Sequence, residues 1–351
     1  MVHVFLLLGC ALVIYLACEW FVNAVEWFGV EFKVGAVAVG TILAAAGTAL
    51  PESVVTLVAV LFGSHDSRNG IAVGAAMGGP LVVGTIAYGV TGAMLLLHKR
   101  AQAKAPAAVT AGGGPEADVP EELRNGGLAD VDTERLAKDQ TWFLVIFAVK
   151  VSLGLVAFAV KPWLGLLFFA AYGLYFWREM RAEGDDASGD GLKPLKIQPR
   201  RDSPARWAVI AQTLATLVVI FAASQLFVRQ LEWAGPALGL SPVVVALLLS
   251  PIATELPEIL NAIIWVRAGK TQLALANISG AMMIQATVPS GIGILFTPWK
   301  FDGPLLLAGV VTAAAVVYLL WMLRSRTLTP VKLTAAAGFY AAFAVGLVFI
   351  A

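Results

Sequence analysis

The sequence has little charge for its length. Only 13% of its 351 residues are charged, against about 25% in a typical soluble domain, whereas 59% are hydrophobic. Several apolar stretches exceed the roughly 18 residues that indicate a membrane span. A soluble hydrophobic core is therefore excluded as the organising feature, and the sequence predicts a polytopic membrane protein.

Cysteine and histidine are also scarce. Cys10 and Cys18, the two cysteines, lie on one predicted helix, roughly 12 Å apart at 1.5 Å per residue, so they cannot form a disulfide with each other. None of the three histidines, His3, His65 and His98, lies at mid-membrane depth. This absence argues against an intramembrane serine hydrolase, and the lack of a His-Glu-x-x-His motif argues against a metalloprotease. We therefore expect no enzymatic activity and no cofactor.

Nucleotide-binding and calcium-sensing motifs are missing as well. Without a P-loop, any transport must depend on ion gradients. No calcium-loop motif indicates a sensor domain. The net charge is only +1 and the basic residues are spread over loops, so no nucleic-acid partner is expected.

Hydropathy predicts ten membrane spans. The first apolar stretch, 1–28, is too long for a signal peptide and lacks a basic start and a small-residue cleavage site, so we interpret it as the first span. The predicted spans are 4–29, 34–62, 71–97, 141–160, 162–178, 206–233, 242–266, 272–296, 303–323 and 331–350.

Basic residues predict the orientation of these spans. They gather in the loops after odd-numbered spans, whereas the loops after even-numbered spans hold only Arg68, Lys161 and Lys300. Loops rich in basic residues stay in the cytoplasm, so both termini are predicted to lie on the outer side of the membrane. The expected location is the cell (plasma or inner) membrane, which the chain crosses several times. Residues 101–140 are predicted to form a disordered cytoplasmic linker, and residues 179–205 a second cytoplasmic linker.

Two copies of one motif place charge where a membrane helix should be apolar. Residues 48–52 read Thr-Ala-Leu-Pro-Glu, and residues 254–258 read Thr-Glu-Leu-Pro-Glu. An ionisable residue at membrane depth is costly, so it indicates a functional site. Each proline removes a backbone donor and frees carbonyls that can bind cations. The pair of motifs therefore points to a duplicated ion transporter.

The duplication extends beyond the motif. Phe21-Val22 matches Phe227-Val228, and Glu26-Trp27 matches Glu232-Trp233, at the same offset of 206 residues. Each half has five predicted spans, so the second half enters the membrane from the opposite side. The predicted fold is therefore all-α, with ten transmembrane helices in two inverted five-helix repeats and a site at the midplane. Spans one to three lie in 1–100, spans four and five in 141–178, and spans six to ten in 206–351.

The motifs carry a family resemblance. Gly47-Thr48-Ala49-Leu50-Pro51-Glu52 followed by Ile71-Ala72-Val73-Gly74 resembles the first alpha-repeat of the calcium/cation antiporter superfamily, which includes sodium/calcium exchangers. Thr254–Glu258 followed by Asn277-Ile278-Ser279-Gly280 resembles the second. The similarity is strongest over about 35–92 and 243–293, and it is that of a divergent, prokaryotic-type member. It implies that Glu52 and Glu258 hold calcium, while threonine, serine and asparagine positions complete the calcium and sodium sites.

The chain departs from this family pattern unevenly. In the first half, Ala49, Ala75, Gly79 and Val83 stand where the family has ligands with side-chain oxygens. In the second half, Glu255 replaces a serine, Ala281 replaces another, Asn277 is kept, and Gln285 stands at a later ligand position. The first half has thus lost oxygens and the second has gained a carboxylate, which weakens the sodium sites that the resemblance implies.

The residues themselves support a cation site. Two carboxylates, Glu52 and Glu258, balance one divalent ion. Thr48 and Thr254 precede them by four residues on the same helical face, where each hydroxyl either binds the cation or bonds back to its own helix. Three clustered carboxylates cannot all ionise easily without cations, so Glu255 is a candidate proton carrier or an attractor of cations.

Four further polar residues lie within predicted spans. Asn277 and Gln285 are candidate ligands or interhelical hydrogen-bonding residues. Glu19 and Lys150 lie near mid-span, and one interpretation is a structural ion pair between them.

These observations predict a secondary-active cation antiporter that exchanges calcium for protons or sodium by alternating access. Spans two, three, seven and eight are expected to build the site, and the first and sixth to move. The alternatives are a sodium/proton exchanger, an exchanger of another metal with protons and, more distantly, an intramembrane enzyme. A channel fits less well, because inverted repeats with broken helices favour alternating access. Inorganic cations and the lipid bilayer are the expected partners, and the oligomeric state is not predicted.

Overall fold

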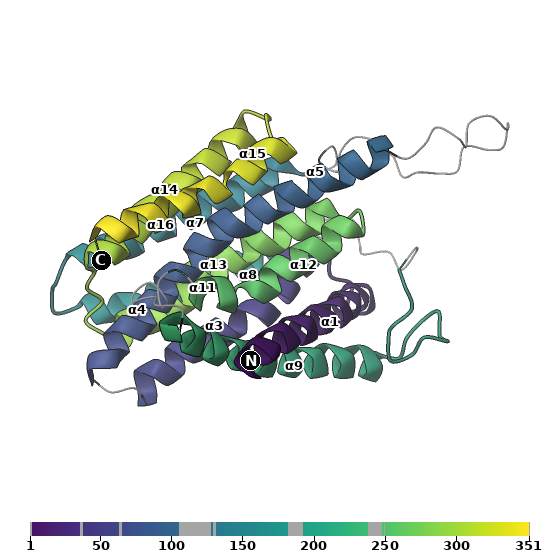
Figure 1. Ribbon diagram of the computed structural model, residues 1–351, viewed down its shortest axis with the longest axis horizontal. Helices are drawn as coiled ribbons and strands as arrows, with labels where there is room; N and C mark the ends of the chain where they lie inside the picture. Colours follow the sequence, from purple (N-terminus) through teal and green to yellow (C-terminus); the bar gives the residue numbers. More distant parts are fainter. Residues whose placement is uncertain are drawn as a thin grey trace.

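The computed structural model describes residues 2–35, 38–62, 65–104, 128, 131–181, 192–237, 248 and 250–350, and the regular elements in these ranges are helices (Figure 1). The first half contains α1 (Val2–Glu31), η1 (Val39–Ala44), α3 (Ala45–Phe62), α4 (His65–Val82), η2 (Val83–Ala87), α5 (Tyr88–Lys104), α7 (Thr133–Leu155), η3 (Lys161–Leu164) and α8 (Gly165–Arg181). The second half contains α9 (Arg206–Ala237), α11 (Ser250–Thr254), α12 (Leu256–Arg267), α13 (Thr271–Phe296), α14 (Gly303–Arg324), α15 (Pro330–Ala335) and α16 (Ala337–Ile350). The predicted all-α fold is confirmed.

In the described residues, the predicted spans overlap a helix or consecutive helices, although α7 ends at Leu155, before the predicted end of its span at 160, and residues 242–247 of the seventh span lie outside the described residues. Among the described residues, six helical stretches are long and apolar enough to cross a membrane by themselves: Phe5–Glu31, Val73–Arg100, Arg206–Phe227, Thr271–Phe296, Gly303–Arg324 and Pro330–Ile350. The other predicted spans correspond to shorter or more polar helices, such as α7, α8 and α12. The chain is therefore a multi-pass helical membrane protein, and the count of ten stays a prediction.

Helix α13 occupies the centre of the molecule. It packs against α3, α4, α7 and α8 of the first half and against α12 of its own half, and Figure 1 shows it between the α14–α16 group and the α1–α9 pair. Nearly all its side chains are buried. The two halves therefore interleave, and a site on α13 is built by both.

Helices α1 and α9 form a pair at one edge (Figure 1). Their outer faces expose large apolar side chains, among them Leu8, Leu12, Trp207, Leu214 and Val218. In a membrane protein such faces contact lipid, because lipid tails are as apolar as leucine.

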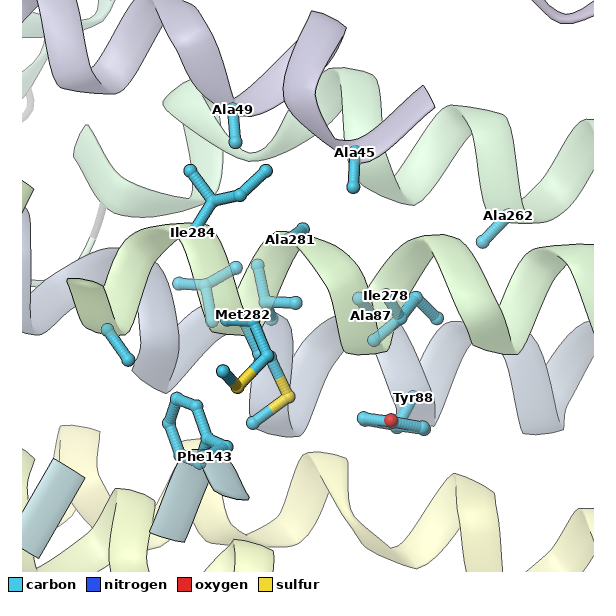
Figure 2. Close-up of a cluster of buried hydrophobic side chains, with 14 of the residues drawn as sticks. Ala45, Ala49, Ala87, Tyr88, Phe143, Ala262, Ile278, Ala281, Met282 and Ile284 are labelled. Atoms are coloured by element: carbon cyan, nitrogen blue, oxygen red, sulfur yellow. The ribbon is translucent and has the colours of Figure 1, made fainter. Parts of the chain in front are cut away.

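Small residues allow α3 and η1 to approach α13 closely. Figure 2 shows Ala45 and Ala49 of α3 directed at the stretch of α13 that carries Ala281 and Ile284. At Gly280 of α13, a Cβ atom would overlap the carbonyl oxygen of Thr41 in η1. Small residues let membrane helices pack closely. Such packing stabilises their association, because the hydrophobic effect contributes little between helices that are already surrounded by lipid.

The two proline motifs affect their helices differently. At the second motif the helix breaks, because α11 ends at Thr254 and α12 begins at Leu256. At the first motif α3 continues through Pro51, and the irregular segment is the π-helix η1 directly upstream. In the first half, the irregular segment that was expected at the proline thus lies about two to three turns upstream of Pro51. π-Helical turns of this kind are frequent at functional sites.

The predicted linkers are partly ordered. Helix α5 runs to Lys104 and α7 begins at Thr133, so the segment predicted as a linker over 101–140 is helical at both ends. Polar residues extend both helices beyond the apolar stretches that hydropathy detects, and Asp132 caps α7 by accepting a hydrogen bond from the Arg135 amide. Residues 105–127 and 129–130 lie outside the described residues. In the second linker, Leu195 is buried, and the Asn23 amide of α1 donates to the Lys193 carbonyl at 3.1 Å.

Candidate cation-binding site

Glu255 and Glu258 lie at the helix break between α11 and α12. Glu255 is the N-cap residue of α12 and Glu258 is in its first turn, with Pro257 between them. Both side chains are fully buried. The first N–H groups of a helix lack helical partners and carry partial positive charge, which favours carboxylates there. The break therefore places two carboxylates at a helix N-terminus inside the protein.

Glu258 has a buried carboxylate with both oxygens unpartnered. Neither oxygen accepts a well-formed hydrogen bond from a described residue, although the Thr48 hydroxyl lies close enough to interact with the carboxylate. The side chain has Glu255, Thr48 of α3 and Cys18 of α1 as neighbours, and the Cys18 thiol is 3.9 Å from the Pro257 carbonyl, a weak hydrogen bond. Burial of a carboxylate without partners is costly. A hard cation would supply the missing interactions, because such cations bind carboxylate oxygens.

Gln285 connects α13 to this helix break. Its amide nitrogen donates a hydrogen bond of 2.5 Å to Oε2 of Glu255. Its amide oxygen is buried and has no partner among the described residues. The structure thus brings Gln285, Glu255 and Glu258 together, as the sequence predicted for one site.

Two buried asparagines add further unpartnered groups. Both amide atoms of Asn277 on α13, and both of Asn261 on α12, have no hydrogen-bond partner in the described part of the chain. Asn277 lies eight residues before Gln285, about 12 Å along the helix axis, so one ion cannot contact both. Asn261 follows Glu258 by three residues on the same helical face.

Both motif threonines bond back to their own helices. The Thr48 hydroxyl donates to the Ala44 carbonyl at 3.1 Å, and the Thr254 hydroxyl donates to the Pro251 carbonyl at 3.1 Å. This is the second of the two roles that the sequence allowed for them. Each hydroxyl oxygen still has lone pairs, so the bond does not prevent it from acting as an acceptor.

The first motif contributes Glu52 on α3. Its backbone is helical, but its side chain lies outside the described residues, so its place as a ligand stays a prediction. One turn later, Thr56 is buried with an unpartnered hydroxyl. Repeat symmetry does not identify Thr56 or Asn261 as candidate ligands, although each is a polar residue one turn after a motif glutamate. No group of three or more His, Cys, Asp or Glu in the described ranges is arranged to hold a metal ion.

Glu19 and Lys150 do not form the ion pair that one interpretation suggested. Glu19 is only half-buried, and its carboxylate lies 3.6 Å from the ammonium group of Lys196 in the 192–205 segment. Lys150 is fully buried on α7 and donates to the Ala76 carbonyl instead. Glu19 faces the segment that covers α1 and α9, which accounts for the separation.

A polar cavity lies apart from this site, at the ends of α7 and α8 that were predicted to be cytoplasmic. Its volume is about 350 Å³, and its lining consists of Asp132, Glu134, Arg135, Lys138, Asp139, Trp142, Tyr175, Arg178 and Glu179. Arg135 and Glu179 pair at 2.5 Å, and Asp139 accepts a hydrogen bond of 3.2 Å from Ser279 of α13. Asp139 precedes the predicted span 141–160. Burial, with a smaller effect of the Glu179 charge, raises the pKa of Asp139 to about 7.

A helix break that carries buried carboxylates between two interleaved halves is typical of a secondary ion transporter. The chain belongs to the sodium/calcium exchanger protein family, whose model matches residues 2–180 and 208–351. The family resemblance read from the motifs is therefore confirmed. The family and the fold are those of exchangers rather than of enzymes.

Solved structures share the fold. Two structures of the sodium-calcium exchanger NCX_Mj, one soaked with 10 mM Na⁺ and zero Ca²⁺ and one with zero Na⁺ and Ca²⁺, superpose with TM-scores of 0.72 and 0.71. Sequence identity is 16% and 17%, and 98% of each chain is covered. At this identity the likeness establishes the fold alone.

A curated relative shares part of the sequence. The putative antiporter CaxA of Alkalimonas amylolytica is 30% identical over 122 residues, which are 34% of this chain and 38% of that relative. The match thus spans well under half of the relative's length.

Proposed function

We propose that this chain is a secondary-active antiporter that moves calcium across the membrane by alternating access, with Glu258 and Glu52 as calcium ligands. The observation that carries the proposal is the Glu258 carboxylate, which is fully buried with no well-formed hydrogen bond on either oxygen. Removal of one partner from a buried ion pair costs about 3–5 kcal/mol, so we infer that a mobile ion, either calcium or a proton, partners this carboxylate.

Oxygen ligands for a calcium ion are available around Glu258. Calcium takes six to eight oxygens in flexible geometry. The unpartnered Asn261 amide, the free Gln285 amide oxygen and the Thr48 hydroxyl supply neutral oxygens near the carboxylates. Carbonyls upstream of Pro51 and Pro257 add more, because a proline cannot donate to them. The separate Asn277 amide would then line a path or a second position rather than the same ion shell.

The counter-ion proposed here is the proton. Sodium sites in the resembling family rely on neutral side-chain oxygens, and Ala49, Ala75, Gly79 and Val83 offer none in the first half. The second half has instead gained Glu255, which is buried beside Glu258. Two neighbouring carboxylates that share protons with calcium would provide the competition that exchange needs. Glu255 is the candidate proton carrier.

Purified protein in proteoliposomes tests this function. Calcium flux is followed under an imposed pH gradient and, separately, under an imposed sodium gradient, with Glu258→Gln vesicles as the control for leak. Calcium accumulation that follows the pH gradient is the expected result. Accumulation driven by sodium alone would contradict proton coupling, and no calcium flux under either gradient would overturn the calcium assignment. Uptake of another divalent metal in place of calcium would favour the metal/proton alternative.

A further inference from the structure

Lys150 is a buried charged group on a helix beside the site. It lies in the middle of α7 and is fully buried. Lysine is almost never fully buried in proteins unless it is paired, and a charged residue at the centre of a membrane helix is costly. Its ammonium group must therefore be well compensated.

Oxygens from both halves of the protein compensate this ammonium group. Nζ donates to the carbonyl oxygen of Ala76 on α4 at 2.7 Å and to the hydroxyl of Ser290 on α13 at 3.3 Å. It also lies 4.8 Å from the centre of the Phe147 ring, a cation–π distance. The Lys150 backbone is itself fixed, because Trp299 donates to its carbonyl at 3.0 Å. A single positive charge thus holds α4 against α13.

These contacts connect Lys150 to the candidate site. Ser290 donates to the Gln285 carbonyl at 3.3 Å, and the Gln285 side chain donates to Glu255 at 2.5 Å. On the other side, Ala76 lies in the stretch of α4 where Ala75 and Gly79 lack the oxygens of the family pattern. Lys150 therefore places a positive charge beside the stretch of α4 that lacks the cation ligands of the family pattern.

We infer that the Lys150 ammonium group is a tethered cation that replaces a mobile monovalent cation between α4 and α13. This inference rests on the proposed antiport function and deepens it. An ammonium group and a small monovalent ion both carry one positive charge and both bind a carbonyl and a hydroxyl oxygen. Because the tethered charge cannot leave, the exchanger needs one mobile monovalent cation fewer in each cycle, and sodium is not required to hold these two helices together.

Three substitutions separate charge from volume at this position. Lys150→Ala removes the ammonium group and leaves space for a small cation, Lys150→Met fills the space without charge, and Lys150→Arg keeps the charge. The matched control is Lys161→Ala. Lys161 is also buried and donates to three backbone carbonyls, of Leu153, Val156 and Trp299 at 2.8–3.2 Å, but none of these belongs to α4 or α13.

The first readout is the thermal unfolding midpoint of the purified protein in sodium, ammonium or choline chloride at equal ionic strength. We expect sodium or ammonium, but not the bulky choline, to raise the unfolding midpoint of Lys150→Ala by several degrees. A bound cation has an effect of this size when its concentration is roughly 10 to 100 times its Kd. Wild type and Lys150→Met should not distinguish the three salts, and Lys161→Ala reports how far a small cation replaces a buried lysine that contacts neither α4 nor α13. This readout does not depend on transport, so it stands even if the calcium assignment fails.

The second readout is calcium flux in proteoliposomes. In choline, the calcium flux of Lys150→Ala should be about tenfold or more below the wild-type rate, because the substitution leaves buried acceptors without a donor. Sodium or ammonium should restore part of that rate, and Lys150→Arg should keep most of it without added cation. The inference is overturned if Lys150→Ala and Lys150→Met respond alike to the salts in both readouts, or if Lys150→Ala keeps the wild-type rate in choline.

Discussion

The Gln285 amide on α13 donates a hydrogen bond of 2.5 Å to the Glu255 carboxylate at the start of α12. Glu255 stands at a serine position of the resembling family, and Gln285 stands at a later ligand position. The carboxylate gained on one helix is therefore matched by an amide donor on the next. This relationship suggests that the second half forms a coherent variant of the site.

Glu258→Gln should remove calcium transport while the protein stays folded. A neutral amide keeps the shape of the side chain but loses the charge, and charge-assisted contacts through two oxygens are worth about 3 kcal/mol, roughly a hundredfold in rate or affinity. Calcium flux and the yield of folded protein in detergent are measured together. The same result is expected for Glu52→Gln. Glu134→Gln, on the exposed surface of α7, is the control, and near-normal flux in both motif variants would contradict the site.

Glu255→Ser should uncouple calcium flux from the pH gradient. The substitution removes the third carboxylate and restores the serine that the resembling family has at this position. We expect calcium release from loaded vesicles to depend on an imposed pH gradient in wild type and to become independent of it in the variant. If release by the variant follows the pH gradient as steeply as wild type does, Glu255 is not the proton carrier.

Gly280→Ala should destabilise the protein. The added methyl group would overlap the Thr41 carbonyl of η1, and overpacking of this kind typically costs 1–3 kcal/mol. The unfolding midpoint in detergent should fall by several degrees. Gly173→Ala in α8 is the control, because its Cβ would meet no atom within 4 Å; an equal fall in both variants would show that the helix interface is not the cause.

Asp139→Asn should flatten the pH dependence of stability. Burial, and then the charge of Glu179, raise the Asp139 pKa from 3.8 to about 7. Between those values the folded protein holds a proton that the unfolded chain has released, so stability is lost as the pH rises from about 4 to about 7. We expect the unfolding midpoint of wild type to fall over this range more than that of Asp139→Asn. Parallel curves for the two proteins would contradict the assignment.

A cysteine at position 107 should report a cytoplasmic linker. The natural cysteines, Cys10 and Cys18, are buried in α1, so Ala107→Cys supplies the accessible thiol. A membrane-impermeant maleimide should label this variant in permeabilised cells and leave it unlabelled in intact cells. Labelling in intact cells would reverse the predicted orientation.

The helices and the repeat could be predicted because they depend on apolar length and on residue identity. Long apolar stretches give the helices, and Thr-x-Leu-Pro-Glu at a constant offset gives the duplication. Glu255 is grouped with Glu258 by their spacing of three residues, and Gln285 by the family resemblance. Helix ends could not be predicted as well, because α7 begins eight residues before its predicted span and six of those eight residues are polar.

Other parts of the site depend on contacts that leave little trace in the sequence. Asn261 and Thr56 have no polar counterpart in the other half, where Val55 and Ala262 stand, so a symmetry search passes over them. The partner of Lys150 on α4 is a backbone carbonyl, which any residue provides. Asp139 is one of seven charged residues around its cavity, and from the sequence these resemble a solvated surface.

The paired helices at the edge of the molecule have a consequence for its relation to lipid. Helix α1 has 30 residues and α9 has 32, so each is about 45–48 Å long, whereas the hydrocarbon core of a bilayer is about 30 Å thick. Both helices must therefore lean or project from the bilayer. Since a change in membrane thickness alters that lean, lipids with shorter or longer acyl chains would act directly on the two helices expected to move, and the composition of the bilayer becomes a control on the rate of exchange.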